Sequence, residues 1–210
     1  MATSSMRIVL FSVFMLFITA CSTTSGLRNV WFDRQYTGAP LKNIMIIAVT
    51  KNTLNRRIFE DAMVSQFGKN GIKATASYTV FPGRDKLSKK IISEKAKKLK
   101  LDGIIVISII AIENEQLYYP PASSYATPLP YYYSIWTYYP QTYETRHSHN
   151  YRINYKNIKL EINLYQPDSG KLLWSSQTQL FDLKFRSIKT ISELLAWDFI
   201  KSMRKAKLIK

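Results

Sequence analysis

Two long apolar runs constrain the fold of this 210-residue chain more than any other feature. One run is Asn43–Val49 and the other is Ile104–Ile112. Neither alternates with polar residues, which is typical of strands buried on both faces of a parallel sheet. Between the runs, residues 53–70 and 86–100 repeat apolar positions at helical spacing. We therefore expect parallel strands joined by helical crossovers.

A further strand is expected between the two helices. Residues Ile72–Phe81 are rich in β-branched and aromatic side chains and end at Pro82-Gly83, a sequence that breaks regular structure. After the second apolar run, Ile158–Tyr165 alternates apolar and polar residues, as a strand with one buried face does. The turn sequence Pro167-Asp168-Ser169-Gly170 then leads into Lys171–Phe181, which predicts an antiparallel hairpin.

The chain ends in one more predicted helix. Thr190-Ile191-Ser192-Glu193 fits a capping box, and apolar residues follow it at helical spacing. The predicted fold class is therefore α/β: a single mixed sheet in the order β-α-β-α-β-β-β-α, with parallel crossovers first, an antiparallel hairpin after them, and helices packed on the sheet.

The first 20 residues predict an export signal. Arg7 precedes an apolar run from Ile8 to Ala20, which is shorter than the roughly 20 apolar residues that cross a bilayer as a helix. A charged start, a short apolar middle and small residues before a cut site define a secretory signal peptide. The tetrapeptide Ile18-Thr19-Ala20-Cys21 resembles the lipobox of bacterial lipoproteins, and Cys21 is the only cysteine. We expect cleavage between Ala20 and Cys21, with acyl chains such as palmitate at Cys21.

Two alternatives to this lipid anchor remain open at the level of sequence. They are an ordinary signal peptide and an uncleaved anchor helix in which Cys21 is incidental. Met6 is an alternative start, since residues 1–5 add nothing to the signal. Ser22 follows the cysteine, in place of the Asp that retains many Gram-negative lipoproteins in the inner membrane. Outer-membrane anchorage, facing the periplasm, is therefore expected, with the inner membrane as the alternative.

The expected organisation has three parts. Residues 1–20 are the signal peptide, residues 21–40 are the lipidated cysteine and a polar tether, and residues 41–210 are a periplasmic α/β domain. Trp31 and Phe32 interrupt the tether and are expected to dock on the domain. Because no cysteine follows Cys21, no disulfide forms within the domain, and its stability must come from its core.

The charge balance indicates anionic partners. The chain carries a net charge of +16, and removal of residues 1–20 leaves 29 basic and 14 acidic residues, a net charge of +15. Such a surplus favours contact with phospholipid headgroups or acidic polymers. Export argues against nucleic acid. The expected partners are the membrane, through the lipid anchor, and an envelope protein or anionic envelope surface; the sequence does not indicate an oligomeric state.

A Tyr/Pro-rich insert is predicted at residues 116–150. Residues 116–143 contain no charged side chain, nine of the 14 tyrosines and five of the eight prolines, so we expect polyproline-like or irregular conformation. Tyr and Trp offer large contact areas with a polar group. Tyr131, Tyr132, Tyr133 and Trp136 are therefore candidate partner-binding residues. The alternative is a disordered low-complexity insert, or a loop packed on its own sheet.

The second predicted helix is rich in lysine. A solvated helix surface is the usual explanation for such a pattern, but the net charge makes contact with an anionic surface a comparable alternative. Lys89, Lys90, Lys97 and Lys98 are the candidate partner-binding residues of this helix.

The sequence contains no recognisable motif for catalysis or for binding a cofactor. No glycine-rich phosphate loop follows Val49, and there is no Gly-x-Ser-x-Gly nucleophile sequence. His147 and His149 lack the further ligands that a zinc site needs and are expected to be exposed loop residues. We therefore predict no catalytic, cofactor-binding or metal-binding residue, and no cofactor.

The carboxylates support at most an alternative hypothesis. Glu60 and Asp61 lie one turn after two arginines, which predicts surface ion pairs on a helix. Glu113 and Glu115 share one face at the end of the Ile104–Ile112 strand, and Lys51 follows the first strand. These last three residues are the candidates for a ligand-binding or hydrolytic site.

The order of these landmarks is similar to that of a group of bacterial envelope lipoproteins that carry a domain of unknown function. Besides the lipobox and the Tyr/Pro insert, the resemblance rests on Ile44–Val49, Arg56–Ala62, Gly71-Ile72, Ser77-Tyr78-Thr79, Asp102-Gly103, Leu164-Tyr165 and Ser169–Ser175. It covers about Trp31 to Leu208. It implies an α/β domain on a lipid tether and gives no residue role beyond Cys21.

The main functional hypothesis is a lipid-anchored outer-membrane lipoprotein that acts as a non-enzymatic periplasmic binding or assembly module. The alternative is a ligand-binding or hydrolytic α/β domain that acts on anionic envelope material. A third hypothesis is a purely structural lipoprotein that covers membrane surface.

Overall fold

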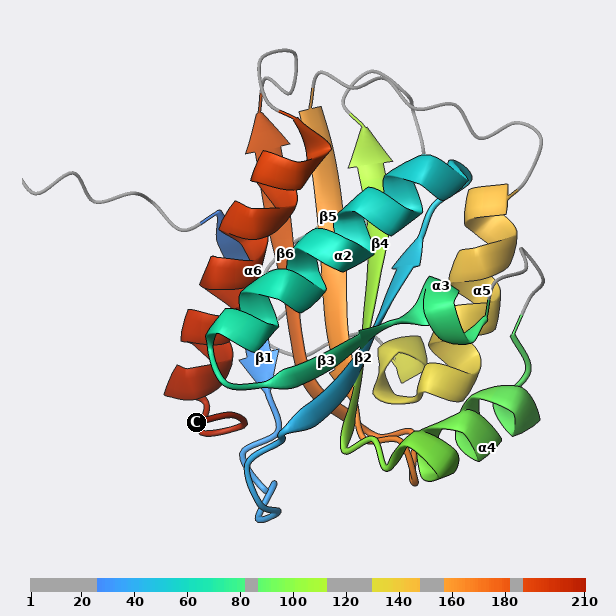
Figure 1. The fold of residues 1–210 in the computed structure, drawn as a ribbon, viewed down its shortest axis with the longest axis vertical. Coiled ribbons are helices and arrows are strands. Elements are labelled where there is room, and N and C mark those ends of the chain that lie inside the picture. The colour runs from blue at the N-terminus through green and yellow to red at the C-terminus, as the bar shows by residue number, and fades with distance from the viewer. Residues whose placement is uncertain (1–25, 82–86, 113–129, 148–156, 182–186) are drawn as a thin grey trace, which may run out of the picture.

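A mixed sheet with helices on both faces forms the domain (Figure 1). The computed structural model describes residues 26–81, 87–112, 130–147, 157–181 and 187–210. In these residues the sheet has six strands in the order β1-β6-β5-β4-β2-β3. The predicted α/β class and single mixed sheet are confirmed, with one strand added at the N-terminal end. The signal peptide and Cys21 lie outside the described residues.

The parallel half of the sheet has the predicted crossovers. Strand β2 (Asn43–Val49) pairs in parallel with β3 (Lys73–Ala76) on one side and with β4 (Gly103–Ile112) on the other. Helix α2 (Thr53–Lys69) connects β2 to β3, and α4 (Lys89–Leu99) precedes β4. Because every side chain of β2 after the first is buried, the strand needs apolar residues on both faces, as its sequence indicated.

Both crossover helices begin at capping side chains. The Asn52 side chain accepts a hydrogen bond from the Asn55 amide at 3.0 Å at the start of α2. Ser88 accepts from the Ile91 amide at the start of α4, so this helix begins later than predicted. Gly71 has φ +78°, a conformation that favours glycine after a helix end.

The second strand is shorter than its sequence suggested. We expected it to run to Phe81, but β3 ends at Ala76 and a one-turn helix, α3 (Ser77–Val80), takes the remaining residues. The Glu60 carboxylate accepts hydrogen bonds from the Ser77 hydroxyl and the Tyr78 amide, and so holds this segment away from the sheet.

The predicted hairpin is confirmed. Strands β5 (Asn157–Tyr165) and β6 (Leu172–Phe181) are antiparallel, and β5 also pairs antiparallel with β4. The turn closes with the Gly170 amide donating to the Gln166 carbonyl at 2.8 Å. Gly170 has φ +72°, which explains why glycine ends the turn sequence.

Part of the segment predicted as a tether is a strand. β1 (Leu27–Phe32) pairs antiparallel with β6 and forms one edge of the sheet. Trp31 and Phe32 pack on the domain, as expected. No strand was predicted here, because β1 contains an irregularity: Asn29 has φ +52°, and the pairing register shifts between Arg28 and Trp31.

The last helix, α6 (Ile188–Lys205), starts earlier than predicted. The Ser187 side chain accepts from the Thr190 amide at 3.1 Å, so Ser187 is the N-cap residue. The expected capping box at Thr190 is therefore wrong by one turn, because Thr190 already lies inside the helix and its amide is one of the donors that the cap satisfies.

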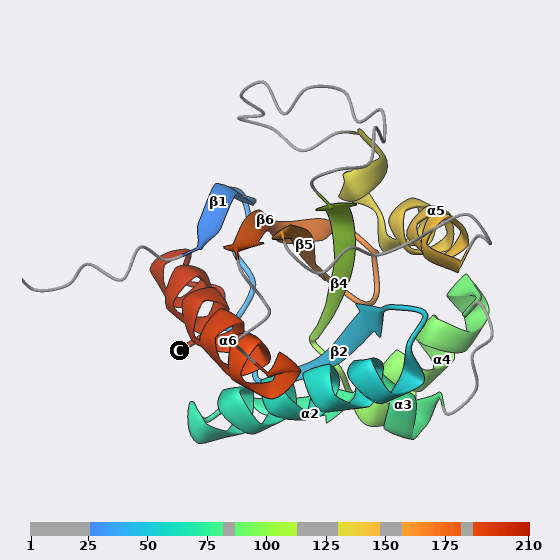
Figure 2. The ribbon, with the colours of Figure 1, turned by 90° about the horizontal axis from the view of Figure 1, so that it is seen from above.

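The sheet separates two apolar cores. Helices α2 and α6 cover one face, where Phe67 and Phe199 pack on side chains of β2, β4, β5 and β6. Helix α4 and a helix at residues 135–147, α5, cover part of the other face, where Ile92 and Tyr138 are buried. Figure 2 shows these two groups of helices on opposite sides of the strands. In the part of the chain that the structure describes, no helix is both long and apolar enough to cross a membrane.

Candidate partner-binding surface

The structure brings one residue from each of the two predicted partner-binding groups into contact. Lys89, at the start of α4, places its ammonium group 5.3 Å from the centre of the Trp136 ring, near the start of α5. This distance is within the range of a cation–π interaction. Tyr133 lies three residues before Trp136, and its side chain is 40% exposed. We call Lys89, Tyr133 and Trp136 the aromatic–basic surface.

The Tyr/Pro insert is more regular than expected. Within the described residues it contains a 3-10 turn, η1 (Pro130–Tyr133), and α5 (Ile135–His147). The polyproline-like or irregular conformation expected for residues 116–143 is therefore wrong for residues 130–143. Pro140 lies inside α5, where the missing amide removes the usual hydrogen bond to the Trp136 carbonyl. Burial of one helix face offsets this loss.

The sheet holds the start of α5 in place. The Ile135 amide donates to the Gly170 carbonyl at 3.0 Å, so α5 starts against the β5–β6 turn. Ser134 accepts hydrogen bonds from the Trp136 amide, through its side chain, and from the Tyr138 amide, through its carbonyl. A Cβ atom on Gly170 would lie 2.9 Å from Cδ1 of Trp136. The indole ring therefore packs directly on the turn glycine, which orients it beside Lys89.

The tyrosines of this segment divide between core and surface. Tyr138 and Tyr139 are buried, and Tyr132 is half-buried with its ring centre 5.5 Å from that of Tyr138. Tyr133 remains exposed, with its ring edge-on to Trp31 at 5.9 Å. Tyr132 therefore contacts the core more than Tyr133 does, and its role in partner binding stays a prediction. The side chain of Tyr131 lies outside the described residues.

A buried hydrogen-bond network ties α5 to the sheet. The Tyr138 hydroxyl donates to Glu161 Oε2 on β5 at 2.7 Å and lies 3.0 Å from Ser108 Oγ on β4. Burial, followed by the nearby Glu161 charge, raises the pKa of Tyr138 well above its usual value. The hydroxyl therefore stays protonated and remains a donor to the carboxylate.

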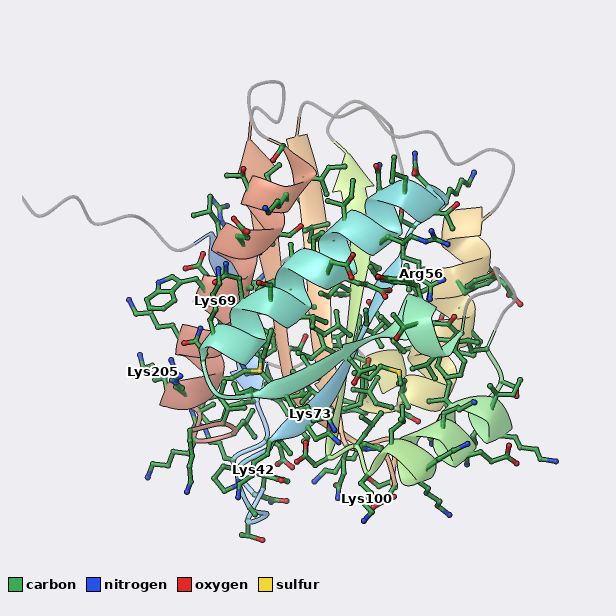
Figure 3. All side chains as sticks on the ribbon, in the orientation of Figure 1. Lys42, Arg56, Lys69, Lys73, Lys100 and Lys205 are labelled. Atoms are coloured by element: carbon green, nitrogen blue, oxygen red, sulfur yellow. The ribbon has the colours of Figure 1, made fainter. Side chains whose placement is uncertain are left out.

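The other predicted lysines are solvent-facing. Lys90, Lys97 and Lys98 are exposed on α4, and the last two lie in its final turn. Positive charge there suits the negative end of the helix dipole. Figure 3 shows Lys100, the residue after α4, pointing away from the domain at the same end. These positions extend the positive charge of the aromatic–basic surface along α4.

Glu60 is the residue that sequence reasoning placed wrongly. It forms the predicted ion pair with Arg56, at 3.1 Å, but its side chain is fully buried rather than on the surface. Glu60 Oε1 also accepts from the Ala48 amide at 2.9 Å and the Ser77 hydroxyl at 2.7 Å, and Oε2 accepts from the Tyr78 amide at 3.0 Å. Figure 3 shows Arg56 between α2 and α3.

The sequence carried a sign of this burial. Glu60 lies three and seven residues before Met63 and Phe67, which places the three side chains on one face of α2. Both apolar partners are fully buried. A carboxylate on the apolar face of a helix indicates a hydrogen-bond or ion-pair partner inside the protein. The two arginines one turn earlier suggested an ion pair on the surface instead.

The residues of the alternative hypothesis are only partly visible. Lys51 lies at the end of β2 and is half-buried, whereas Glu113 and Glu115 lie outside the described residues, as do Ala20, Cys21 and His149. Among the residues with described positions, no group of three or more His, Cys, Asp or Glu side chains is arranged to hold a metal ion.

Comparison with known proteins gives fold likeness at low identity. No protein-family model matches the chain, and no curated protein matches it. A PelC dodecamer from Paraburkholderia phytofirmans is 8% identical with a TM-score of 0.44, over 83% of this chain and 95% of that one. The lipoprotein GNA1162 from Neisseria meningitidis is 7% identical with a TM-score of 0.39, over 78% of this chain and 99% of that one. At these values, the likeness carries no argument about function.

Proposed function

We propose that the chain is a lipid-anchored envelope lipoprotein, held in the outer membrane through Cys21, that binds an acidic partner in the periplasm without catalysing a reaction. One observation of geometry carries the binding part of this proposal. Lys89 and Trp136 were candidates for separate reasons, and the Lys89 ammonium group lies 5.3 Å from the centre of the Trp136 ring, three residues after the exposed Tyr133.

The chemistry of this surface suits an acidic partner. An ammonium group over an indole ring keeps donors available for carboxylate or phosphate oxygens. The ring and the exposed phenol of Tyr133 add apolar contact area with little side-chain entropy to lose. The exposed lysines of α4 extend the positive potential, which attracts an acidic partner before contact.

The buried carboxylates support a non-enzymatic role. Glu60 accepts four hydrogen bonds from groups of the chain itself, and Glu161 accepts one from Tyr138. Both side chains have almost no solvent exposure. A general base needs access to a substrate proton, so these two groups are better explained as internal supports of α3 and α5.

The anchor is tested by intact mass and membrane fractionation of the wild type against Cys21→Ser. We expect a cleaved and acylated wild-type protein in the outer-membrane fraction, and loss of both acylation and membrane location in the variant. An unmodified or uncleaved wild-type protein would contradict the lipid anchor, and the positive charge would then make nucleic acid a partner to test.

The binding surface is tested by crosslinking in cells. A photo-crosslinking amino acid replaces Tyr133, and its adducts are compared in the Lys89→Glu and Lys69→Glu backgrounds. Both substitutions reverse one exposed charge, but Lys69 lies on α2, which covers the opposite face of the sheet. We expect Lys89→Glu to abolish the adduct and Lys69→Glu to leave it. Equal effects of the two substitutions would exclude the aromatic–basic surface as the binding site.

A further inference from the structure

The outer side of α6 carries an unusual row of exposed residues. Thr190, Leu194, Trp197, Lys201 and Lys205 are spaced four, three, four and four residues apart, which places them on one face of the helix. We call this row the α6 stripe. All five residues are exposed, and Leu194 and Trp197 have exposed fractions of 49% and 56%. Two adjacent large apolar side chains are thus in water on a helix whose other side fills the core.

The first described residue of the chain lies beside this stripe. The backbone amide of Gly26 donates a hydrogen bond to the carboxylate of Asp198, the residue next to Trp197. Gly26 is five residues after Cys21. Five residues span at most about 18 Å when fully extended. A lipid on Cys21 therefore cannot be far from the middle of α6.

The composition of the α6 stripe suits a phospholipid surface. Trp is favoured at the boundary between headgroups and acyl chains because its ring is apolar and its N–H is polar. Lys201 and Lys205 continue the row after Trp197, and lysines near a membrane are attracted to anionic headgroups. Figure 3 shows Lys205 pointing outward from α6. The adjacent Asp198 is half-buried. Its carboxylate accepts a hydrogen bond from the Gly26 amide and lies close to Lys201.

We propose that the α6 stripe lies on the surface of the bilayer that holds the lipid anchor, with Leu194 and Trp197 in the headgroup region and Lys201 and Lys205 on anionic headgroups. This inference rests on the proposed lipid anchor at Cys21. The anchor and the helix then form two contacts with one membrane, so the domain takes a fixed orientation instead of turning freely on its tether.

A phospholipid surface explains the stripe better than a second protein. A stable protein interface takes about 20–30 residues from each side. The α6 stripe offers two large apolar side chains, which is too little for the core of such an interface. Two side chains are sufficient for the bilayer contact because the acyl chains supply the affinity and the helix needs only to set orientation.

The test uses the full lipidated protein, in which acylation consumes the only native thiol. A single cysteine is introduced by Leu194→Cys on the stripe or by Glu94→Cys as the control. Glu94 is exposed on α4, which lies across the sheet from α6. Each variant is labelled with a polarity-sensitive fluorophore and reconstituted into vesicles of phosphatidylethanolamine and phosphatidylglycerol. Flotation measures anchoring, and emission wavelength with iodide quenching measures the surroundings of the label.

We expect both variants to float, with a blue shift and loss of iodide quenching at residue 194 but not at residue 94. Equal, water-like signals in floating protein would overturn the inference while the anchor stands. Failure of both variants to float would overturn the anchor and the inference with it. Shielding of residue 194 that disappears when the protein is diluted in excess lipid would assign the stripe to a second copy of the chain, and would also overturn the inference.

Discussion

The buried carboxylate of Glu60 gives the sharpest test of the fold. Its two oxygens accept hydrogen bonds from the Ala48 amide on β2, the Arg56 side chain on α2, and the Ser77 hydroxyl and Tyr78 amide of α3. The substitution Glu60→Gln keeps the size of the side chain and removes its charge. We expect it to destabilise the domain strongly, because no orientation of the new amide satisfies all four donors.

The magnitude follows from the geometry. If the amide oxygen of Gln replaces Oε1, its NH2 group faces the Tyr78 amide, donor against donor. If it replaces Oε2, the NH2 group faces three donors. An unsatisfied buried donor costs about 1–3 kcal/mol, and a hydrogen bond to a charged group contributes about 1.5–3 kcal/mol. Arg56 would also keep its charge in a place where its side chain is 12% exposed. We expect a loss of about 3–4 kcal/mol, near that for breaking a buried ion pair.

Urea and thermal unfolding followed by circular dichroism measure this loss. For a domain of this size, about 3–4 kcal/mol lowers the melting temperature by roughly 10 °C. The matched control is Asp61→Asn, at the next position of α2. Asp61 is exposed and accepts a hydrogen bond from the Tyr78 hydroxyl at 2.7 Å, which an amide oxygen can also accept. The control should change the unfolding free energy by no more than about 0.5 kcal/mol.

If the unfolding free energies of the Glu60→Gln and Asp61→Asn proteins differ by less than about 1 kcal/mol, this reasoning is refuted. Such a result would mean that the four donors find other acceptors or water when the charge is removed. The ion pair with Arg56 would then be no more than the surface pair that the sequence suggested.

Three further perturbations test other parts of the structure. Gly170→Ala should cost about 1–3 kcal/mol, because φ is +72° and the new Cβ meets Trp136; unchanged stability and tryptophan emission would contradict this packing. Burial raises the pKa of Tyr139 from 10.0 to about 12. The folded state therefore binds more protons than the unfolded state between pH 10 and 12, so the unfolding free energy should fall as pH rises, by up to about 2.7 kcal/mol for this group. Tyr139→Phe should reduce this dependence of the unfolding free energy on pH, measured by urea unfolding at several pH values. A dependence equal to that of the wild type would show that Tyr139 does not cause it. Ser187→Ala should cost about 1 kcal/mol through loss of the α6 cap, and Thr190→Ala less; the reverse order would restore the predicted capping box.

The central fold was predictable because its signals are local. An apolar run such as Ile44–Val49 is typical of a strand in the middle of a sheet, and the turn sequence ending in Gly170 allows few conformations. β1 gave no such signal. Its pairing depends on the partner edge offered by β6, and its irregularity at Asn29 hides the period of two that marks a strand.

The helix α5 shows how composition can conceal a periodic pattern. Ile135, Tyr138, Tyr139 and Thr142 are spaced three, one and three residues apart, and all four are buried. The helical face was therefore present in the sequence. Tyr and Thr are weak helix formers and Pro140 opposes a helix, so local propensity favoured irregular structure. Packing on the sheet, with Tyr138 bonded to Glu161, overrides that propensity.

The candidate site was predictable in its parts but not in its arrangement. Trp136 and the lysines of α4 were identified from their residue types, yet nothing in the sequence places Lys89 over the Trp136 ring. That contact depends on two long-range packings, α4 on β2 and α5 on the β5–β6 turn. The same packings turn the ring of Tyr132 toward Tyr138, which the sequence did not indicate either.

The two proposed contacts use opposite faces of one sheet. The α6 stripe belongs to the face that α2 and α6 cover, whereas the aromatic–basic surface belongs to the face that α4 and α5 cover (Figure 2). If α6 lies on the bilayer, the sheet stands between the membrane and Trp136, so the binding surface faces away from the lipid. Loss of the stripe by Leu194→Ser with Trp197→Ser should then leave anchoring intact and reduce crosslinking at residue 133, because a freely turning domain no longer presents this surface in one direction. Undiminished crosslinking in that double variant would show that partner binding does not depend on orientation at the membrane.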